Sequence, residues 1–211
     1  MRKFTSLALV LGLMFSTAAF GKKLPEIHKT GISEFDPTFM KAKAIHTDLD
    51  TVRSSLKTAN KNLATTLALP ENTSLSDSLA ELKKRSNNKI STVLEDGKWP
   101  KLSATDAVPS DVAAGIEAVN SLVDALKTSE ATLADMPEAS KALVSTASKF
   151  PSQLNAGMLT SNNLSLSELP SVGKKVKNNV AAVKGTPERV ERVTDLTVNM
   201  TTQVVKAFPA N

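Results

Sequence analysis

The sequence IHTDLDTVRSSLKTANKNLATTL, residues 45–67, decides the fold class. Its apolar residues recur at steps of three and four, with polar and charged residues between them; they are Ile45, Leu49, Val52, Leu56, Ala59, Leu63 and Leu67. This spacing predicts one apolar face of an α-helix and comes close to the a/d seam of a heptad repeat. Because a helix with one narrow apolar stripe is not stable alone in water, we expect other helices to cover it.

Further amphipathic stretches follow, separated by Pro, Gly and short polar segments. The first helix is expected from Pro37 to Ala68, with Asp36 as its N-cap. Further helices are expected over residues 75–94, 110–134, 139–150, 170–184 and 187–208, with a short turn of helix near 154–159 and Thr186 as the cap of the last helix. Few aromatic residues and no alternating strand pattern favour helices throughout. The prediction is an all-α fold, an elongated antiparallel bundle of four to six helices with heptad-like seams.

Residues 95–109 interrupt the helical pattern. Asp96-Gly97 and Trp99-Pro100 are turn signals within this stretch. It is expected to be a crossover loop, or a boundary between two helical hairpins. The expected organisation is a signal peptide over 1–21, an extended leader over 22–36 and a helical bundle over 37–211, with a candidate sub-boundary at 95–109.

Residues 1–21 predict export. Arg2 and Lys3 are followed by an apolar run and then by small residues that suit cleavage between Gly21 and Lys22. The alternative is a membrane anchor, but the apolar run is shorter than the ~20 residues that a spanning helix needs. We therefore expect a secreted or periplasmic protein without an integral membrane segment after cleavage.

The charge balance argues against nucleic acid as a partner. The chain has 26 Lys and Arg against 21 Asp and Glu, a net charge of +5, and loss of Arg2 and Lys3 with the signal peptide lowers it to +3. This excess is weaker than nucleic-acid binders usually carry. Because the chain has no Cys, an exported form must be held together by packing instead of disulfides.

Residue types that carry catalysis are sparse. The chain has two His, no Cys, no Gly-x-Ser-x-Gly turn and no Gly-rich phosphate loop. His28 falls in the leader. His46 has Asp50 four residues later, which could form a metal-binding or proton-shuttling pair or a simple surface pair. One His and one Asp do not complete a metal site. We therefore expect no enzyme activity, cofactor or metal; a metal protein that uses His46 is the alternative.

Three features are candidate interaction sites. Two are basic clusters that could meet phosphates or anionic lipid headgroups, or could be solvated helix faces; they are Lys83, Lys84 and Arg85, and Lys174, Lys175 and Lys177. The third is Trp99, the single Trp, which could contact a partner or fold back and plug the end of the bundle. Sequons begin at Asn72, Asn163 and Asn199, and the sequence leaves open whether they are glycosylated.

These observations favour a non-enzymatic, exported helical protein that acts by binding another protein or itself. The alternative is a carrier of lipid or another hydrophobic ligand, or a holdase-type chaperone, because amphipathic helices with Lys-rich flanks can cover apolar cargo. Narrow apolar stripes and few aromatic residues argue against this alternative. The expected partners are a protein or a second copy of the chain, with anionic lipid as a further candidate.

Overall fold

The computed structural model of the chain describes residues 25–210. It is mostly helical, with 70% helix and 6% strand, which confirms the helical part of the prediction. The expected signal peptide over residues 1–21 lies outside the described residues. Between residues 25 and 210, no helix is both long enough and apolar enough to cross a membrane.

Long helices, short helical turns and one hairpin make up the fold. The long helices are α1 (Asp36–Thr66), α3 (Ser110–Leu133), α4 (Met136–Ala147), α7 (Leu169–Lys184) and α8 (Thr186–Ala207). α2 (Leu75–Ser86) has the same 12-residue length as α4. The short helical turns are α5 (Phe150–Gln153), α6 (Ala156–Ser161) and the 3₁₀ helix η2 (Leu166–Glu168). An antiparallel hairpin of β1 (Ile90–Glu95) and β2 (Trp99–Ala104) completes the described part of the chain.

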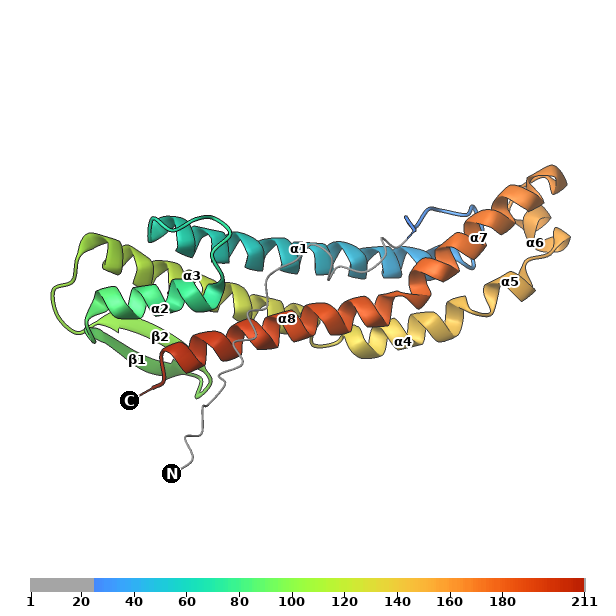
Figure 1. Cartoon of the computed structure of the whole chain (residues 1–211). Coiled ribbons are helices and arrows are strands. Elements are labelled where there is room, and N and C mark those ends of the chain that lie inside the picture. Colours follow the sequence, from blue (N-terminus) through green and yellow to red (C-terminus); the bar gives the residue numbers. More distant parts are fainter. Residues whose placement is uncertain (1–24, 211) are drawn as a thin grey trace, which may run out of the picture.

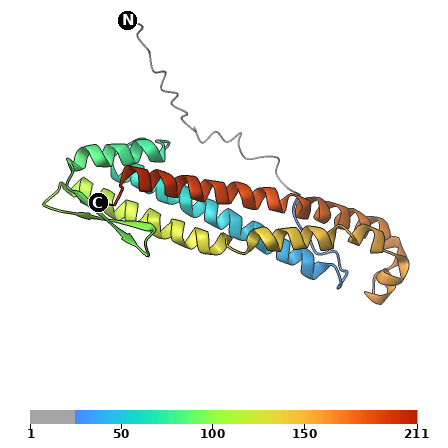
Figure 2. The ribbon, with the colours of Figure 1, turned by 90° about the horizontal axis from the view of Figure 1, so that it is seen from below.

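Three long helical paths run side by side along an elongated molecule (Figures 1 and 2). The first is α1, the second is α3 continued by α4 and α5, and the third is α7 continued by α8. α1 contacts α3, α4 and α8, and α8 also contacts α3 and α4. The hairpin and α2 pack at the end where the C-terminus lies, whereas α5, α6 and η2 form the opposite end.

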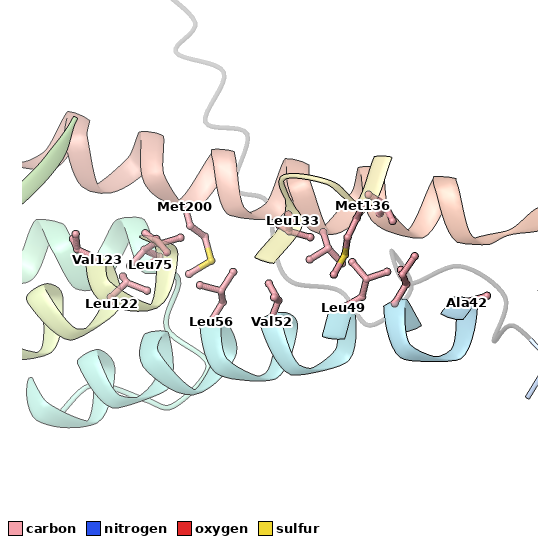
Figure 3. Packing of buried hydrophobic residues seen from close by; sticks show 14 of the residues in the cluster. Ala42, Leu49, Val52, Leu56, Leu75, Leu122, Val123, Leu133, Met136 and Met200 are labelled. Carbon is pink, nitrogen blue, oxygen red and sulfur yellow. The ribbon is translucent and has the colours of Figure 1, made fainter. Parts of the chain in front are cut away.

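The apolar stripe of α1 lies in the core, as its period predicts. Leu49, Val52 and Leu56 are at most 5% exposed. In Figure 3, the Met200 side chain of α8 points toward Leu56, and Met136 of α4 lies beside Leu49. Because burying apolar surface stabilises a fold by about 25 cal/mol per Å², packing on this stripe is the main force that holds α1 against the other helices.

The prediction of an all-α chain is wrong at residues 87–104, which contain the hairpin. α2 ends at Ser86, well short of Leu94, because Asn87 and Asn88 adopt left-handed backbone conformations, with φ of 48° and 63°. Asp96 and Gly97 also have positive φ, at 53° and 68°, as a type I′ hairpin turn requires. The expected irregular loop 95–109 therefore contains the turn and β2.

The start of α1 also differs from the expectation. Asp36 does not cap the helix, since the N-cap is Phe35, which makes no side-chain capping bond. The Asp36 carboxylate accepts hydrogen bonds from Thr30 N–H at 2.7 Å, Thr30 Oγ1–H at 2.8 Å and Gly31 N–H at 3.2 Å. Gly31 has φ of 85°, which glycine reaches without strain. Asp36 thus folds the leader into a turn ahead of the helix.

Two other boundary predictions need correction. Pro151 does not end a helix but stands in the first turn of α5. Thr186 does not cap α8; Gly185 holds that position, and Thr186 is a fully buried residue of the helix. Gly185 has φ of −83° and ψ of −8°, so the backbone passes from α7 into α8 in a nearly helical conformation.

Candidate interaction surfaces

The two ends of the molecule present different surfaces (Figure 1). We call β1, β2, α2 and the parts of α1, α3 and α8 beside them the hairpin end. We call residues 150–169, which include α5, α6 and η2, the tip. At each end, one Asn side chain on a long helix holds a non-helical segment in place.

At the hairpin end, Asn120 of α3 binds the outer edge of β2. Its Oδ1 accepts a hydrogen bond from Leu102 N–H at 2.9 Å, and its Nδ2 donates to Leu102 C=O at 3.0 Å. Leu102 therefore points both backbone groups away from β1, which places it in a non-hydrogen-bonded pair with Thr92, its partner in register. α3 thus closes this edge of the sheet.

The outer edge of β1 is not closed in this way. In a non-hydrogen-bonded pair both residues point their backbone groups outward, so Thr92 does as well, and Leu94 follows by the two-residue period of a strand. Glu95 C=O accepts from Lys98 N–H and so faces β2, which agrees with this alternation. Between residues 25 and 210, no protein group bonds to the outward N–H and C=O of Thr92 and Leu94.

Apolar side chains lie beside this free edge. Val93 is 62% exposed and Leu94 is 39% exposed, whereas Thr92 is buried. An unpaired strand edge with exposed apolar side chains is a site at which another chain can add a strand. The β1 edge is therefore a candidate protein-binding surface.

Trp99, a predicted interaction residue, begins β2 and is only 8% exposed. Its indole belongs to the core, which leaves little of it for a partner. Lys98 Nζ lies 4.9 Å from the centre of the indole ring, within the range of a cation–π contact. Opposite Trp99, the Glu95 carboxylate binds Lys101 at 2.7 Å and Lys127 at 2.6 Å. These two ammonium groups lower the pKa of Glu95 to about 2.

The first basic cluster, Lys83 to Arg85, mostly joins α2 to its neighbours. Arg85 binds Glu81 at 2.9 Å and Asp111 of α3 at 3.0 Å. Lys83 Nζ donates to a backbone C=O in the last turn of α8 at 3.2 Å. Lys84 remains largely exposed, 3.7 Å from Glu81. This cluster therefore offers little free charge to an anionic partner.

Toward the tip, Asn179 of α7 holds the leader as Asn120 holds β2. Its Oδ1 accepts a hydrogen bond from His28 N–H at 3.1 Å, and its Nδ2 donates to His28 C=O at 2.6 Å. The Asn179 side chain is fully buried, and Ile27 and Ile32 of the leader are at most 2% exposed. Residues 25–35 of the leader thus contribute side chains to the core, although these residues form neither helix nor strand.

The tip is fixed to the leader and to α1. Asn162 Nδ2 donates to the Glu34 carboxylate at 3.1 Å, and Asn162 Oδ1 accepts from Ser33 N–H at 2.8 Å. The Phe150 ring stacks on Phe35 at 4.2 Å between centres and meets Phe39 edge to face at 5.4 Å. These contacts give the tip a defined position relative to the long helices.

Two leucines are exposed on the tip. Leu166 of η2 is 62% exposed and Leu169 at the start of α7 is 36% exposed. Between them, the Glu168 carboxylate accepts hydrogen bonds from Ser165 N–H at 2.8 Å and Ser165 Oγ–H at 3.0 Å. These bonds lower the pKa of Glu168, to which Lys175 contributes more weakly. They also fix the short turn that presents Leu166.

The second basic cluster lies on α7, directly behind the tip. Lys174, Lys175 and Lys177 are all exposed. In the part of the chain that the structure describes, no carboxylate lies within salt-bridge distance of any of them. Unlike Lys83 and Arg85, these cations remain available to an external anion.

His46 and Asp50 do not bond to each other. His46 Nε2 lies 2.8 Å from Thr186 Oγ1, and Asp50 pairs with Arg189. Thr186 Oγ1 also lies 3.3 Å from Ala182 C=O of α7. Burial is the main cause that lowers the pKa of His46, and the positive charge of Arg189 adds to it, against the opposing effect of Asp50. A neutral His46 thus joins α1 to the α7–α8 junction.

Two open grooves lie between the long helices. The groove between α1 and α3, of about 880 Å³, is lined by small and hydroxyl-bearing side chains, with Glu117 as its one charged residue. The groove between α1 and α4, of about 530 Å³, includes Ile45 and Leu143, with Lys41 as its one charged residue. Neither groove contains an acid–base pair. Over residues 25–210, no group of three or more His, Asp or Glu side chains is placed to hold a metal ion.

No family model, curated protein or solved structure gives a significant match to this sequence. The function is therefore inferred from the surfaces described above. Of these, the sequence singled out the lysines of α7. It missed the β1 edge, although Asp96-Gly97 between runs of strand-forming residues is a strong hairpin signal. It also missed the exposed Leu166.

Proposed function

We propose that this is an exported, non-enzymatic protein whose helices form an elongated antiparallel bundle with heptad-like seams, and that it acts by binding protein chains. The observation that carries the proposal is the unpaired outer edge of β1, with Val93 and Leu94 exposed beside it. Export rests on the signal-like sequence of residues 1–21. The non-enzymatic part rests on the scarcity of catalytic residue types in the sequence.

On this proposal the bound chain adds a strand beside β1. The outward N–H and C=O groups of Thr92 and Leu94 supply the backbone bonds, and Val93 supplies apolar contact. β2 is unsuitable as the docking edge, because Asn120 already binds Leu102. Pro100, whose outward position has no N–H, removes a further donor from that edge.

A second copy of the chain is the simplest strand donor, because β1 is self-complementary. If two β1 strands pair antiparallel about Thr92, Ile90 of each lies opposite Leu94 of the other, and the outward backbone groups of both meet. The same register places Lys89 opposite Glu95 of the second copy. Within its own chain Glu95 already binds Lys101 and Lys127, and Lys89 binds Asp106 at 3.3 Å, so backbone bonds and the Ile90–Leu94 contact would hold this register.

The test is the mass of the processed chain, from Lys22 onward, by light scattering over a range of concentrations. We expect a two-chain mass that appears as the concentration rises, since a strand pair buries too little area for a permanent dimer. Leu94→Pro removes an outward N–H but no β1–β2 hydrogen bond, so it should shift the mass toward one chain. The matched control, Leu94→Ala, keeps this N–H and should still associate.

Each outcome bears on a distinct part of the proposal. A one-chain mass for the parent at every concentration would overturn self-pairing. Strand addition by other chains would then be tested with a synthetic peptide of residues 88–96. If the peptide does not slow amide hydrogen exchange at Thr92, strand addition at β1 is overturned as well. If Leu94→Pro and Leu94→Ala associate equally, the contact does not lie at the β1 edge.

A further inference from the structure

The positive charge of the chain is concentrated toward the tip. Residues 149–184 contain five Lys and one Glu, a net charge of +4. The expected processed chain carries +3, so its residues outside this segment sum to −1. The leader and the first part of α1, residues 25–48, contribute −1 with His neutral, and residues 135–148 contribute a further −1, so the balance of these three segments stays positive at +2. The positive excess of the whole chain is therefore concentrated in residues 149–184.

The same region exposes apolar side chains. Leu166 and Leu169 are 62% and 36% exposed, and three further apolar residues of the tip, Leu154, Met158 and Leu164, are partly buried against the core. The capping bonds between Ser165 and Glu168, and the ties of the tip to the leader, show that this surface belongs to the folded state. Ordered leucines at the end of an elongated molecule, with unpaired lysines behind them, form an amphipathic surface.

We infer that the tip docks onto a lipid bilayer that contains anionic headgroups. Leu166 and Leu169 would enter the interfacial layer, and Lys174, Lys175 and Lys177 would lie at the level of the headgroups. The net charge of residues 149–184 is positive and these lysines follow the leucines along α7, which fits an anionic apolar boundary. Nucleic acid fits less well, because the aromatic ring of the tip, Phe150, is buried and cannot stack on bases.

Two carboxylates, those of Glu168 and Glu34, place negative charge near this surface. Glu168 is bound by Ser165, and Glu34 is bound by Asn162. Both remain acceptors of hydrogen bonds from the protein itself, and the lysines of residues 149–184 outnumber them. The surface thus keeps a positive balance beside the leucines.

This inference is independent of strand addition at β1, because the two surfaces lie at opposite ends of the molecule (Figure 1). A chain bound by its tip would hold the hairpin end away from the bilayer. The β1 edge would then remain free to meet another chain. Loss of either interaction should leave the other intact.

A site-specific label gives the sharpest test. Because the chain has no Cys, Leu166→Cys can be labelled at one position with a polarity-sensitive dye. We expect its emission to rise with vesicles of phosphatidylglycerol and phosphatidylcholine, and not with phosphatidylcholine alone. The control is Val198→Cys on α8, which is similarly exposed at 59% and lies away from the tip; its emission should not change.

Flotation with the same anionic vesicles tests the two chemistries separately. Replacing Lys174, Lys175 and Lys177 by Gln should weaken binding about 100-fold, at roughly five-fold per lysine. The charge-matched control replaces Lys57, Lys84 and Lys206 by Gln and should bind nearly as the parent does. Leu166→Ser should weaken binding about ten-fold, whereas Val198→Ser should not.

Several results would overturn the inference. One is a parent chain that stays with the unbound protein at every anionic lipid fraction. Another is equal loss of binding in the two triple-Gln variants, which would show attraction without a docking surface. A third is an equal rise in emission from labels at 166 and 198, which would show that the protein does not meet the bilayer by its tip.

Discussion

At the hairpin end and on α7, an Asn side chain holds a non-helical segment, but the two Asn residues are buried to different depths. Asn120 binds the N–H and C=O of Leu102, and Asn179 binds the N–H and C=O of His28. Asn179 is fully buried, whereas Asn120 is only partly buried. A segment that lies outside helices and sheets must find other partners for its backbone N–H and C=O groups. The carboxamide of Asn supplies them, because it has one acceptor oxygen and an NH₂ group with two donors. The comparison shows how a helix can replace a neighbouring strand.

What each segment leaves exposed differs. Residues 25–35 of the leader contribute Ile27, Ile32 and Phe35 to the core, with His28 exposed between them. The hairpin is held on one side only, so the outward groups of β1 stay unpaired, and Val93 is exposed beside them. The hairpin end therefore presents hydrogen-bonding groups, and the tip presents leucines and lysines. This difference is why we assign a protein partner to one end and a lipid surface to the other.

The largest expected effect comes from the aromatic cluster that anchors the tip. Phe150→Ala removes a buried ring that contacts Phe35 and Phe39, and should lower the free energy of unfolding by about 3–5 kcal/mol. The measurement is urea unfolding followed by circular dichroism and by fluorescence of Trp99, the single Trp. If the two ends are less coupled in the variant, helix loss should precede the Trp99 transition. A free energy of unfolding close to that of the parent would contradict the anchoring role.

Replacing Asn179 or Asn120 by Ala tests whether burial depth sets the strength of these two contacts. Asn179→Ala removes the fully buried side chain that binds both backbone groups of His28, and should lower the free energy of unfolding by about 2–4 kcal/mol. Asn120→Ala should cost only about 1 kcal/mol, because water can reach the partly exposed edge of β2. Amide hydrogen exchange should show faster exchange in residues 27–32 for the first variant and near residue 102 for the second. Equal costs would mean that burial depth does not distinguish the two contacts.

The sequence predicted the long helices well because their apolar period is local information. The period over residues 45–67 placed α1, and Pro137 marked the break between α3 and α4. The hydrogen bond between Asn179 and His28 could not be predicted, since the two residues are 151 positions apart and no local pattern links them. The hairpin differs for another reason: Asp96-Gly97 signals a turn, but Ile90, Val93 and Leu94 before it also fit the apolar period of a helix over residues 75–94. The exposure of Leu166 depends on packing of the whole tip, which a single sequence does not show.

Acidification should affect the region around His46 first. The pKa of His46 is lowered from 6.5, mainly by burial, so the folded state favours the neutral imidazole. Below pH 6.5 the unfolded state therefore binds more protons than the folded state. The contribution of neutral His46 to the free energy of unfolding is present above pH 6.5 and is lost as the pH falls below that value. The measurement is the free energy of unfolding between pH 8 and 5.5. His46→Gln keeps a hydrogen-bond donor without titrating, and should flatten this part of the pH profile. An identical profile in this variant would rule His46 out as the cause.

The smallest expected effect is the acid response of the hairpin end. Lys101 and Lys127 lower the pKa of Glu95 from 4.5 to about 2, so its contribution to stability is present above pH 4.5 and is lost as the pH falls toward 2. Amide exchange of β1 and β2 should therefore accelerate only in this lower window, after the loss around His46. Glu95→Gln should show fast exchange in the strands already at neutral pH and little further change on acidification. Because these groups are solvent-screened, the change should be small and should shrink with added salt. If exchange in the strands instead accelerates together with that around His46, near pH 6, the two ends titrate as one unit and Glu95 does not govern the hairpin.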